Sequence, residues 1–572
     1  MKMLYSWLLL AGMVGLSFCS VNGQALSADG STFVSDQVPM EWISESNLKR
    51  FAPSFRSLSG EIVGGGEKKA RFVYLVPSDR QVRDDYKVAL FDMALYLRER
   101  YQIELGNDVT FEPQIEVYQT DHTADWYRTH ENGGFASWFL NNSLGEGFRY
   151  TGGYFGDPDN RWNFFIDADP ECGQGIGANG VPPNGGWAVL AANDLRGLTR
   201  QQNVPQCSGD SPDNGGIYRW IGGAGHELGH TWDLPHPPGC GSGGEYGGCS
   251  GGVTAYLSWM YVGYYFFPDT YFLPEDKQKL LTDPIDAPFF QPIDLRPPTI
   301  PDFDDDRNAD PTLWDPSTGT WKVFRNSDAT VSTFQWGTNG DKLVPGDYDG
   351  DGQTDFAVWR PSNSTWYVLQ STNNSLVAVP FGLSSDTPVA KDYDGDLKTD
   401  IAVWRPGTGV WYVLRSGTGI TTAVQFGTNG DVPVPADFNG DRRADCAVFR
   451  PSDRVWYIYD YYLNSFSAIE FGLNGDQLAA ADYDGDSKAD IAVWRPSDGN
   501  WYVLGSEVGF YSTHFGSTGD VPTSADYDGD AKTDLAIWRP STATFWIQGS
   551  SVGLQVVSMG QSSDIPVSFQ PY

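Results

Sequence analysis

The sequence predicts a protein of two domains: an α+β domain over residues 70–295, followed by an all-β propeller of about six blades over residues 300–572. Two observations predict this fold class. Strand-like and helix-like patterns alternate in the first region, whereas beyond Pro298 a nine-residue acidic element recurs about every 45 residues beside short apolar segments. A repeat of this period with about four short strands matches one propeller blade.

The first residues predict export. A lysine precedes an apolar run, and Gly23-Gln24-Ala25 offers a small-x-small cleavage site, so residues 1–25 are interpreted as a secretory signal peptide. A lipoprotein anchor at Cys19 is unlikely, because Phe18 is bulkier than the small residue that usually precedes such a cysteine. No later run approaches the roughly 20 apolar residues of a transmembrane helix. Residues 26–69 are interpreted as an N-terminal extension or a short pro-segment.

The composition limits the classes of partner. There are 73 acidic and 38 basic residues, which gives a net charge of −35. This balance argues against binding to nucleic acid, whose phosphates attract positive charge. The aromatic content of 14% and hydrophobic content of 40% are enough to form folded cores. The acidic surface is consistent with solubility, with calcium binding, or with both.

The α+β domain is predicted from its local patterns. Apolar residues recur at helical spacing over 82–101, and short apolar runs favour strands on either side. The expected strands lie at 70–79, 114–120, 162–169 and 187–194. Residues 173–186 are rich in glycine and proline and are expected to form a loop. The segment 185–194 is either an ordinary core strand or an edge strand that pairs with an extended peptide; the residues leave both open.

Four cysteines cluster in this domain: Cys172, Cys207, Cys240 and Cys249. In an exported chain they predict two disulfides. Three pairings are possible, and we favour Cys240–Cys249, which would close a glycine-rich loop, together with Cys172–Cys207. Zinc binding by these thiols is the alternative, although no CxxC spacing supports it. Cys446 stands apart from the cluster.

The segment HELGHTWDLPH runs from His226 to His236 and holds three of the six histidines in the chain. His226 and His230 are one helical turn apart, so both imidazoles can bind one zinc ion. His236 can join them only if the helix ends and the chain turns back, and Asp233 and Pro235 stand where that break is needed. Three histidines leave one zinc position open to water, and Glu227 is placed to take its proton.

This pattern resembles that of the metzincin metalloproteases, HExxHxxGxxH followed by a Met-turn. The resemblance implies one catalytic zinc bound by His226, His230 and His236, with Glu227 as the general base. Asp233 stands where the family usually has glycine, and aspartate tolerates the left-handed conformation better than most residues.

The Met-turn candidate is Met260, which lies 24 residues after His236. In some metzincins a tyrosine two residues beyond this methionine is an additional zinc ligand. Here that position is Val262, and Tyr261 comes one residue early, so a tyrosine ligand is left open.

The recurring acidic elements are numbered here as loops 1 to 6. Carboxylates at alternating positions around a tight turn can converge on one calcium ion. The side chains at positions 1, 3, 5 and 9 are Asp302, Asp304, Asp306 and Asp310 in loop 1; Asp347, Asp349, Asp351 and Asp355 in loop 2; Asp392, Asp394, Asp396 and Asp400 in loop 3; Asp437, Asn439, Asp441 and Asp445 in loop 4; Asp482, Asp484, Asp486 and Asp490 in loop 5; and Asp526, Asp528, Asp530 and Asp534 in loop 6. Simple acidic surface turns are the alternative.

These loops, the Phe-Gly pairs at 381–382, 426–427, 471–472 and 515–516, and the recurring Trp-Arg-Pro resemble FG-GAP or VCBS-type propeller repeats. The resemblance implies several structural calcium ions and an adhesive or scaffolding role. The final segment DIPVSFQPY is similar to the strand that precedes loop 4, and loop 1 lacks such a strand. The C-terminus is therefore expected to complete the first blade and close a ring of six blades, or of seven if a degenerate blade is present.

The sequence thus predicts a secreted, extracellular or periplasmic, zinc-dependent endopeptidase. Glu227 acts as the general base toward a zinc-activated water, and a calcium-binding propeller targets the enzyme to a matrix, cell-surface or glycan ligand. The substrate is a peptide or protein. The alternative is a propeller-based extracellular adhesin or binding protein in which the protease-like domain is only a scaffold.

Overall fold

The computed structural model describes residues 68–105, 112–134, 137–155, 157–170, 177–180, 186–199, 201, 216–234, 260, 272–282, 289–290, 299–462 and 464–567. The predicted signal peptide, His236 and the four clustered cysteines lie outside these residues. Among the described residues, no helix combines the length and the apolar character needed to cross a membrane.

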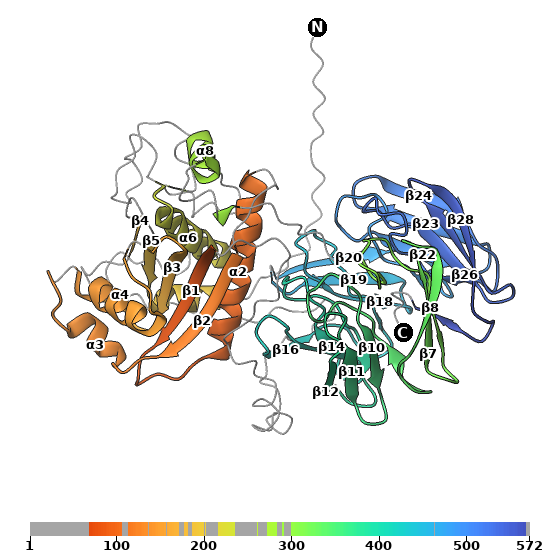
Figure 1. The fold of residues 1–572 in the computed structure, drawn as a ribbon, viewed down its shortest axis with the longest axis horizontal. Coiled ribbons are helices and arrows are strands. Elements are labelled where there is room, and N and C mark those ends of the chain that lie inside the picture. The colour runs from red at the N-terminus through yellow and green to blue at the C-terminus, as the bar shows by residue number, and fades with distance from the viewer. Residues whose placement is uncertain are drawn as a thin grey trace, which may run out of the picture.

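The first domain contains a five-stranded sheet in the order β2-β1-β3-β5-β4 (Figure 1). Its strands are β1 (Lys69–Val76), β2 (Glu112–Gln119), β3 (Asn160–Ile166), β4 (Gly177–Gly180) and β5 (Gly186–Leu190). Strands β1, β2, β3 and β5 are parallel, and β4 pairs antiparallel with β5. Helices flank the sheet: α2 (Asp84–Leu105), α3 (Ala124–Thr129), α4 (Trp138–Thr151), α5 (Ala192–Leu198), α6 (Gly216–Thr231) and α8 (Pro274–Thr282).

Two sequence expectations for this sheet were wrong. The segment 173–186 was expected to be loop, but Gly177–Gly180 forms the edge strand β4. The segment 187–194 was expected to be a strand throughout, but β5 ends at Leu190 and α5 begins at Ala192. Strand β5 is hydrogen-bonded to β3 and β4, so it lies inside the sheet and is not the edge that a peptide could extend. Short glycine-rich strands lack the apolar alternation from which strands are predicted.

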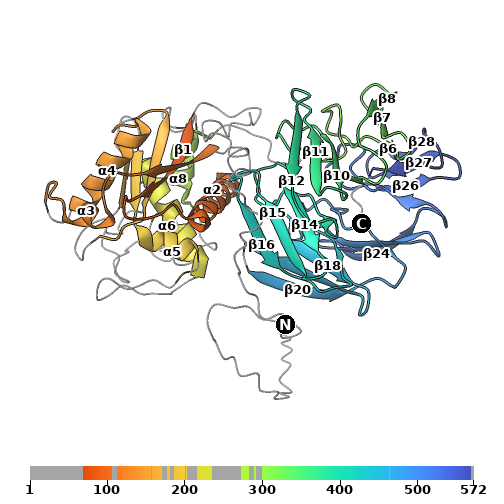
Figure 2. The same cartoon turned by 90° about the horizontal axis from the view of Figure 1, so that it is seen from below.

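Helix α2 is buried on more than one side. Leu90, Met93 and Leu97 join the core cluster between the sheet and α6. Asp92, Arg98 and Gln102 on the same helix are also buried. Figures 1 and 2 both place α2 beside the propeller, and the Arg415 side chain of the propeller donates a hydrogen bond of 3.2 Å to Asp92. A helix buried all round packs between two bodies.

The second domain is a propeller of six four-stranded sheets, as predicted. The first blade holds β29 (Ile565–Pro566), β6 (Thr312–Asp315), β7 (Thr320–Arg325) and β8 (Thr330–Gln335), and the second holds β9 (Lys342–Leu343), β10 (Phe356–Arg360), β11 (Thr365–Leu369) and β12 (Leu376–Pro380). The third holds β13 (Thr387–Pro388), β14 (Ile401–Arg405), β15 (Val410–Leu414) and β16 (Thr421–Gln425), and the fourth holds β17 (Val432–Pro433), β18 (Cys446–Arg450), β19 (Val455–Asp460) and β20 (Ser465–Glu470). The fifth holds β21 (Gln477–Leu478), β22 (Ile491–Arg495), β23 (Asn500–Gly505) and β24 (Gly509–His514), and the sixth holds β25 (Val521–Pro522), β26 (Leu535–Arg539), β27 (Thr544–Gly549) and β28 (Gly553–Ser558).

The ring closes as the sequence predicts. Strand β29, from the C-terminal end, pairs antiparallel with β6, so Ile565 lies opposite Trp314 and Pro566 opposite Leu313. The C-terminal segment therefore completes the first blade. Closure leaves no blade at the end of an open array, where a sheet face would be exposed.

The Trp-Arg-Pro and Phe-Gly motifs serve the packing of each blade. In the third blade, the indole N–H groups of Trp404 and Trp411 both donate to the Phe426 carbonyl, at 3.2 and 2.8 Å. Gly427 follows with a φ of 99°, which favours glycine. Arg405 forms a two-pronged pair with Asp386 at 2.9 Å. Both tryptophans are buried. An indole N–H that leaves water needs a hydrogen-bond partner, and the Phe426 carbonyl supplies it.

Candidate metal centres

Helix α6 carries the first two predicted zinc ligands and the predicted base. The Nε2 atoms of His226 and His230 lie 3.1 Å apart, with their rings nearly perpendicular at 85°. Two nitrogens bound at about 2.0–2.1 Å to a tetrahedral zinc would be separated by about 3.3 Å. The pair therefore fits one zinc ion without any change of helix geometry.

The His230 ring is oriented by the end of the helix. Its Nδ1 lies 2.7 Å from the Leu234 carbonyl oxygen, to which Nδ1–H donates, and this leaves the Nε2 lone pair directed at His226. Burial, partly offset by this hydrogen bond, lowers the pKa of His230. A neutral imidazole fixed through its other nitrogen is the form that binds a metal.

The chain leaves α6 as the sequence predicts. Asp233 has a φ of 56°, the left-handed conformation expected at the position where the metzincin pattern has glycine. Its backbone N–H donates to the His230 carbonyl, and the Leu234 N–H returns to the Gly229 carbonyl. The described chain stops at Leu234, so the predicted third ligand His236 lies outside the described residues.

Met260 lies against α6 at Gly229, one residue before His230. It is fully buried, and a Cβ at Gly229 would lie 2.4 Å from the Met260 Sδ. Beside Met260, the hydroxyl of Tyr101 on α2 donates to the Gly225 carbonyl at 3.2 Å. Helix α6 is therefore fixed beneath its two histidines by close packing. Tyr261 and Val262, where a further ligand was left open, lie outside the described residues.

Glu227 retains some exposed surface, yet desolvation by the surrounding chain and the negative charge of Asp194 raise its pKa to about 7. A carboxyl with a pKa near neutrality can both accept and return a proton at physiological pH. This property suits the predicted role of general base.

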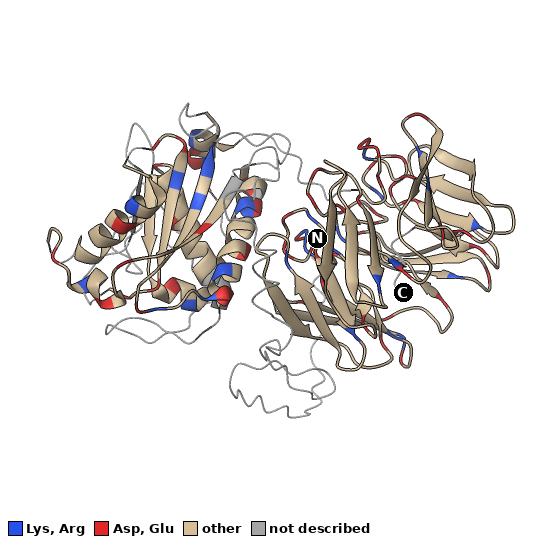
Figure 3. Ribbon diagram, turned by 60° about the horizontal axis from the view of Figure 1, so that its bottom comes forward, with Lys and Arg blue, Asp and Glu red and all other residues tan. Residues whose placement is uncertain are grey.

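The acidic loops gather carboxylates as the repeat spacing suggests. Figure 3 shows acidic residues, in red, in the loops between the propeller strands. In five loops, three carboxylates offer ligand atoms within 4.8 Å of one another. These groups are Asp302, Asp304 and Asp306; Asp347, Asp349 and Asp351; Asp392, Asp394 and Asp400; Asp482, Asp484 and Asp490; and Asp526, Asp528 and Asp534.

Loop 2 shows why such a group fits a cation. Backbone N–H groups of Gly350 and Gly352 donate to Asp347, and those of Tyr348 and Ser371 donate to Asp355. The carboxylate at position 3 differs, because both oxygens of Asp349 are buried without a hydrogen-bond partner among the described residues.

The same holds at position 3 of four other loops, in each of which one carboxylate oxygen is buried without such a partner in the described part of the chain: Asp304, Asp394, Asp484 and Asp528. A buried carboxylate oxygen without a partner is costly unless a cation binds it. The donor set is all oxygen, which is the chemistry calcium prefers.

Loop 4 is arranged differently. The Asn439 amide donates to Asp460 at 3.1 Å and to Asp445 at 3.4 Å, while its oxygen accepts the Asp441 N–H at 2.8 Å. The oxygen predicted as a calcium ligand is thus already hydrogen-bonded. At position 3, loop 4 therefore has an amide whose N–H groups donate hydrogen bonds, whereas the other loops have a carboxylate that only accepts them.

Burial raises the pKa values of the carboxylates at positions 1 and 9 of the loops from their usual 3.8, for example to about 6 at Asp347 and about 7 at Asp355. The metal-free folded state therefore binds protons more readily than the unfolded chain. In the presence of a chelator, the free energy of unfolding should be greatest near pH 4 and should fall as the pH rises through 6 to 7. Calcium should reverse this trend, because it binds the ionised carboxylates. Chemical unfolding at several pH values checks the sign, and parallel pH profiles with calcium and with chelator would contradict it.

The sequence did not reveal the contact between the domains. Asp92 on α2, Arg415 at the end of β15 and Arg443 in loop 4 are all buried there. The sequence did contain one indication of this contact, because apolar and aromatic residues lie on every face of the predicted helix 82–101.

Cys446 is a free, buried thiol whose pKa is raised by that burial.

Residues 392–448 match the model of the FG-GAP-like repeat family. This segment holds loop 3, the strands β14, β15 and β16 of the third blade and the beginning of the fourth blade, so the resemblance expected for the propeller is confirmed there. No curated protein sequence matches the chain.

The solved structures to which the chain is similar include a streptogramin B lyase, with 8% identity, a TM-score of 0.31 and coverage of 47% of this chain and 88% of that chain. A lectin of Agrocybe aegerita that recognises terminal N-acetylglucosamine has 16% identity, a TM-score of 0.31 and coverage of 44% and 76%. OgpA of Akkermansia muciniphila, solved with an O-glycopeptide, has 12% identity, a TM-score of 0.26 and coverage of 63% and 92%. Likenesses this weak do not assign an activity to this chain.

Proposed function

We propose that the chain is a secreted zinc-dependent endopeptidase of the metzincin type, carried on a calcium-binding propeller. The observation that carries the proposal is the pair of imidazole nitrogens on α6, 3.1 Å apart, with Glu227 in the same helical turn. The left-handed Asp233 and the packing of Met260 beneath Gly229 support it. A helix that only fills a core has no need of two converging imidazoles and an adjacent carboxyl.

A zinc ion held by His226, His230 and His236 would supply Lewis-acid chemistry to a peptide carbonyl and to water. Glu227 accepts the proton of the attacking water and passes it to the leaving amine. Its pKa of about 7 in the metal-free chain allows both transfers. Strand β4 forms the edge of the sheet, where an extended peptide can pair through its backbone.

The direct test is digestion of a peptide library by the full chain, with and without a zinc chelator. We expect cleavage that stops with chelator and returns when zinc is added. Intact peptides under both conditions would contradict the proposed activity.

The purified protein should also contain one zinc per chain. His226→Ala, His230→Ala and His236→Ala should each lose most of that zinc, because two remaining ligands bind far more weakly than three. Atomic absorption after dialysis measures the content, and His122→Ala, at a histidine outside α6, is the control. Full retention in His236→Ala would remove that residue from the ligand set.

A second candidate is an extracellular binding protein that acts through its propeller. The FG-GAP-like match lies in this part of the chain. Apolar side chains are also exposed on and beside the outer strands β24 and β28, with Phe510 at 61% and Leu554 at 55%. Exposed apolar patches often mark interaction sites. Binding to matrix or glycan that survives in a Glu227→Ala variant, in a chain that cleaves no peptide, would favour this function.

A further inference from the structure

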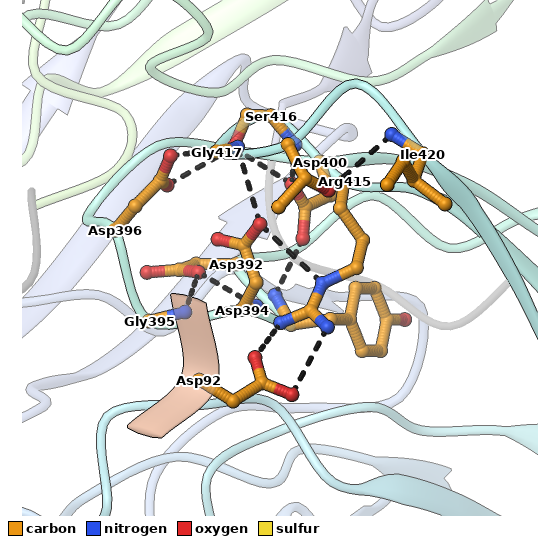
Figure 4. A network of polar contacts seen from close by, with 12 residues as sticks. Asp92, Asp392, Asp394, Gly395, Asp396, Asp400, Arg415, Ser416, Gly417 and Ile420 are labelled. Atoms are coloured by element: carbon orange, nitrogen blue, oxygen red, sulfur yellow. Dashed lines mark hydrogen bonds and ion pairs between the residues drawn. The ribbon is translucent and has the colours of Figure 1, made fainter. Parts of the chain in front are cut away.

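The segment beside loop 3 is joined to the first domain by a buried ion pair. Arg415 reaches from the end of β15 to Asp92 on α2, donating to one carboxylate oxygen at 3.2 Å and to the other at a shorter distance (Figure 4). Both side chains are buried. This is a two-pronged charge-assisted pair, among the strongest side-chain contacts in a protein.

The same guanidinium touches the predicted cation site. Its Nε lies 3.4 Å from the Asp394 carboxylate, which belongs to the ligand group with Asp392 and Asp400. Asp394 is fully buried, and its second oxygen has no hydrogen-bond partner among the described residues. Arg415 therefore stands between two acidic partners, with its two terminal nitrogens turned to α2 and away from the loop.

Neighbouring contacts hold α2 in this place. Phe91 packs so closely on Gly417 that a Cβ there would lie 2.2 Å from its ring. Arg443 donates to the Asp394 backbone carbonyl at 3.1 Å and to the Asp92 carbonyl at 3.3 Å, and so bridges loop and helix directly. Tyr462 of the propeller lies beneath Arg443 and belongs to the core cluster of the first domain.

The corresponding position carries an arginine in one other blade, where Arg325 beside loop 1 makes its contacts within its own β7–β8 hairpin. Gln370 occupies it beside loop 2, and Gly505 and Gly549 occupy it beside loops 5 and 6. A Cβ at Gly505 would lie 2.7 Å from the Asp484 carboxylate, so this position faces the carboxylate at position 3. A free arginine there would compete with a bound cation for the same oxygens and would repel it.

We propose that Asp92 holds the two terminal guanidinium nitrogens of Arg415 away from the loop 3 carboxylates, so that cation binding in loop 3 and docking of α2 on the propeller strengthen each other. The inference rests on the proposed calcium sites. When α2 is docked, Asp92 neutralises Arg415, and the Asp394 oxygen that Arg415 does not contact is left to the cation. When α2 is released, Arg415 turns to Asp394. Because linkage is reciprocal, a cation in loop 3 favours docking to the same extent.

Hydrogen exchange measured peptide by peptide on the full chain, during a calcium titration, tests the coupling. In the wild-type chain the peptides of loops 3 and 5 should each gain protection and define a calcium midpoint. Asp92→Asn should raise the loop 3 midpoint about tenfold, within the usual range of coupling between two sites. The loop 5 midpoint should not change. Asp84→Asn, at an exposed position of the same helix, is the matched control.

Two further variants identify Arg415 as the mediator. Asp92→Asn combined with Arg415→Gln should restore the loop 3 midpoint, since the competing charge is gone. Arg415→Gln alone should lower the loop 3 midpoint. If Asp92→Asn does not fold, this single variant tests whether Arg415 competes with calcium. A loop 3 midpoint that is the same in Asp92→Asn and Asp84→Asn, or that stays raised in the double variant, would overturn the coupling. If calcium protects no loop in the wild-type chain, the calcium assignment itself is wrong.

Discussion

Replacing Glu227 with alanine should leave the fold and the zinc content unchanged but lower peptide hydrolysis by about 10²–10⁴-fold, the usual contribution of a positioned general base. The imidazoles of His226 and His230 remain in place, so only proton transfer is removed. Initial rates on a cleavable peptide, measured together with zinc content, separate this effect from a loss of metal.

Two companion variants sharpen this test. Glu227→Gln keeps the size of the side chain and should be as inactive as Glu227→Ala. Glu275→Ala, which removes an exposed carboxylate on α8, should retain the native rate. Cleavage by Glu227→Gln at the native rate would show that this residue does not move the proton.

Removing calcium should lower the melting temperature of the propeller by many degrees. Each acidic loop holds three or four neighbouring carboxylates that repel one another when no cation is bound. A ligand that binds only the folded state adds about 2.7 kcal/mol per site at a hundredfold excess over its dissociation constant. Calorimetry of the fragment 300–572, with calcium and with chelator, measures the shift, and the closed ring of six blades supports independent folding of this fragment. Identical melting curves would mean that the loops are only acidic turns.

The effect should also be local. Changing Asp347, Asp349 and Asp351 together to asparagine should remove one site and reduce the calcium-dependent rise in melting temperature by the share of one loop. Asp305→Asn, an exposed non-ligand position of loop 1, should not change it. Zinc content and peptide cleavage of the full chain should be unaffected by either change. An undiminished calcium response in the triple variant would exclude loop 2 as a site.

The propeller could be predicted from the sequence because its information is local and repeated. Each blade carries an acidic loop of the same length, four blades carry Trp-Arg-Pro and four carry Phe-Gly, so the pattern recognised in one repeat applies to the others. The closing strand was predicted for the same reason, since DIPVSFQPY is similar to a segment whose place in a blade was known from the other repeats.

The candidate zinc pair was likewise determined by the sequence, because residues four apart on a helix share one face. The edge strand β4 was not, since Gly177–Gly180 carries no apolar alternation and pairs only because β5 offers it a free edge. The hydrogen bonding of Asn439 could not be predicted either, because it depends on Asp460 at the end of β19.

Only the tertiary structure brings Asp92 and Arg415 together. They lie 323 residues apart, and neither belongs to a motif. Their pairing depends on how α2 packs against the propeller, which no local pattern encodes. The sequence therefore determined the repeats, the loops and the spacing of His226 and His230. The tertiary structure decided which of the loops lie against the first domain, because only the packed chain places an arginine between a helix and a group of carboxylates.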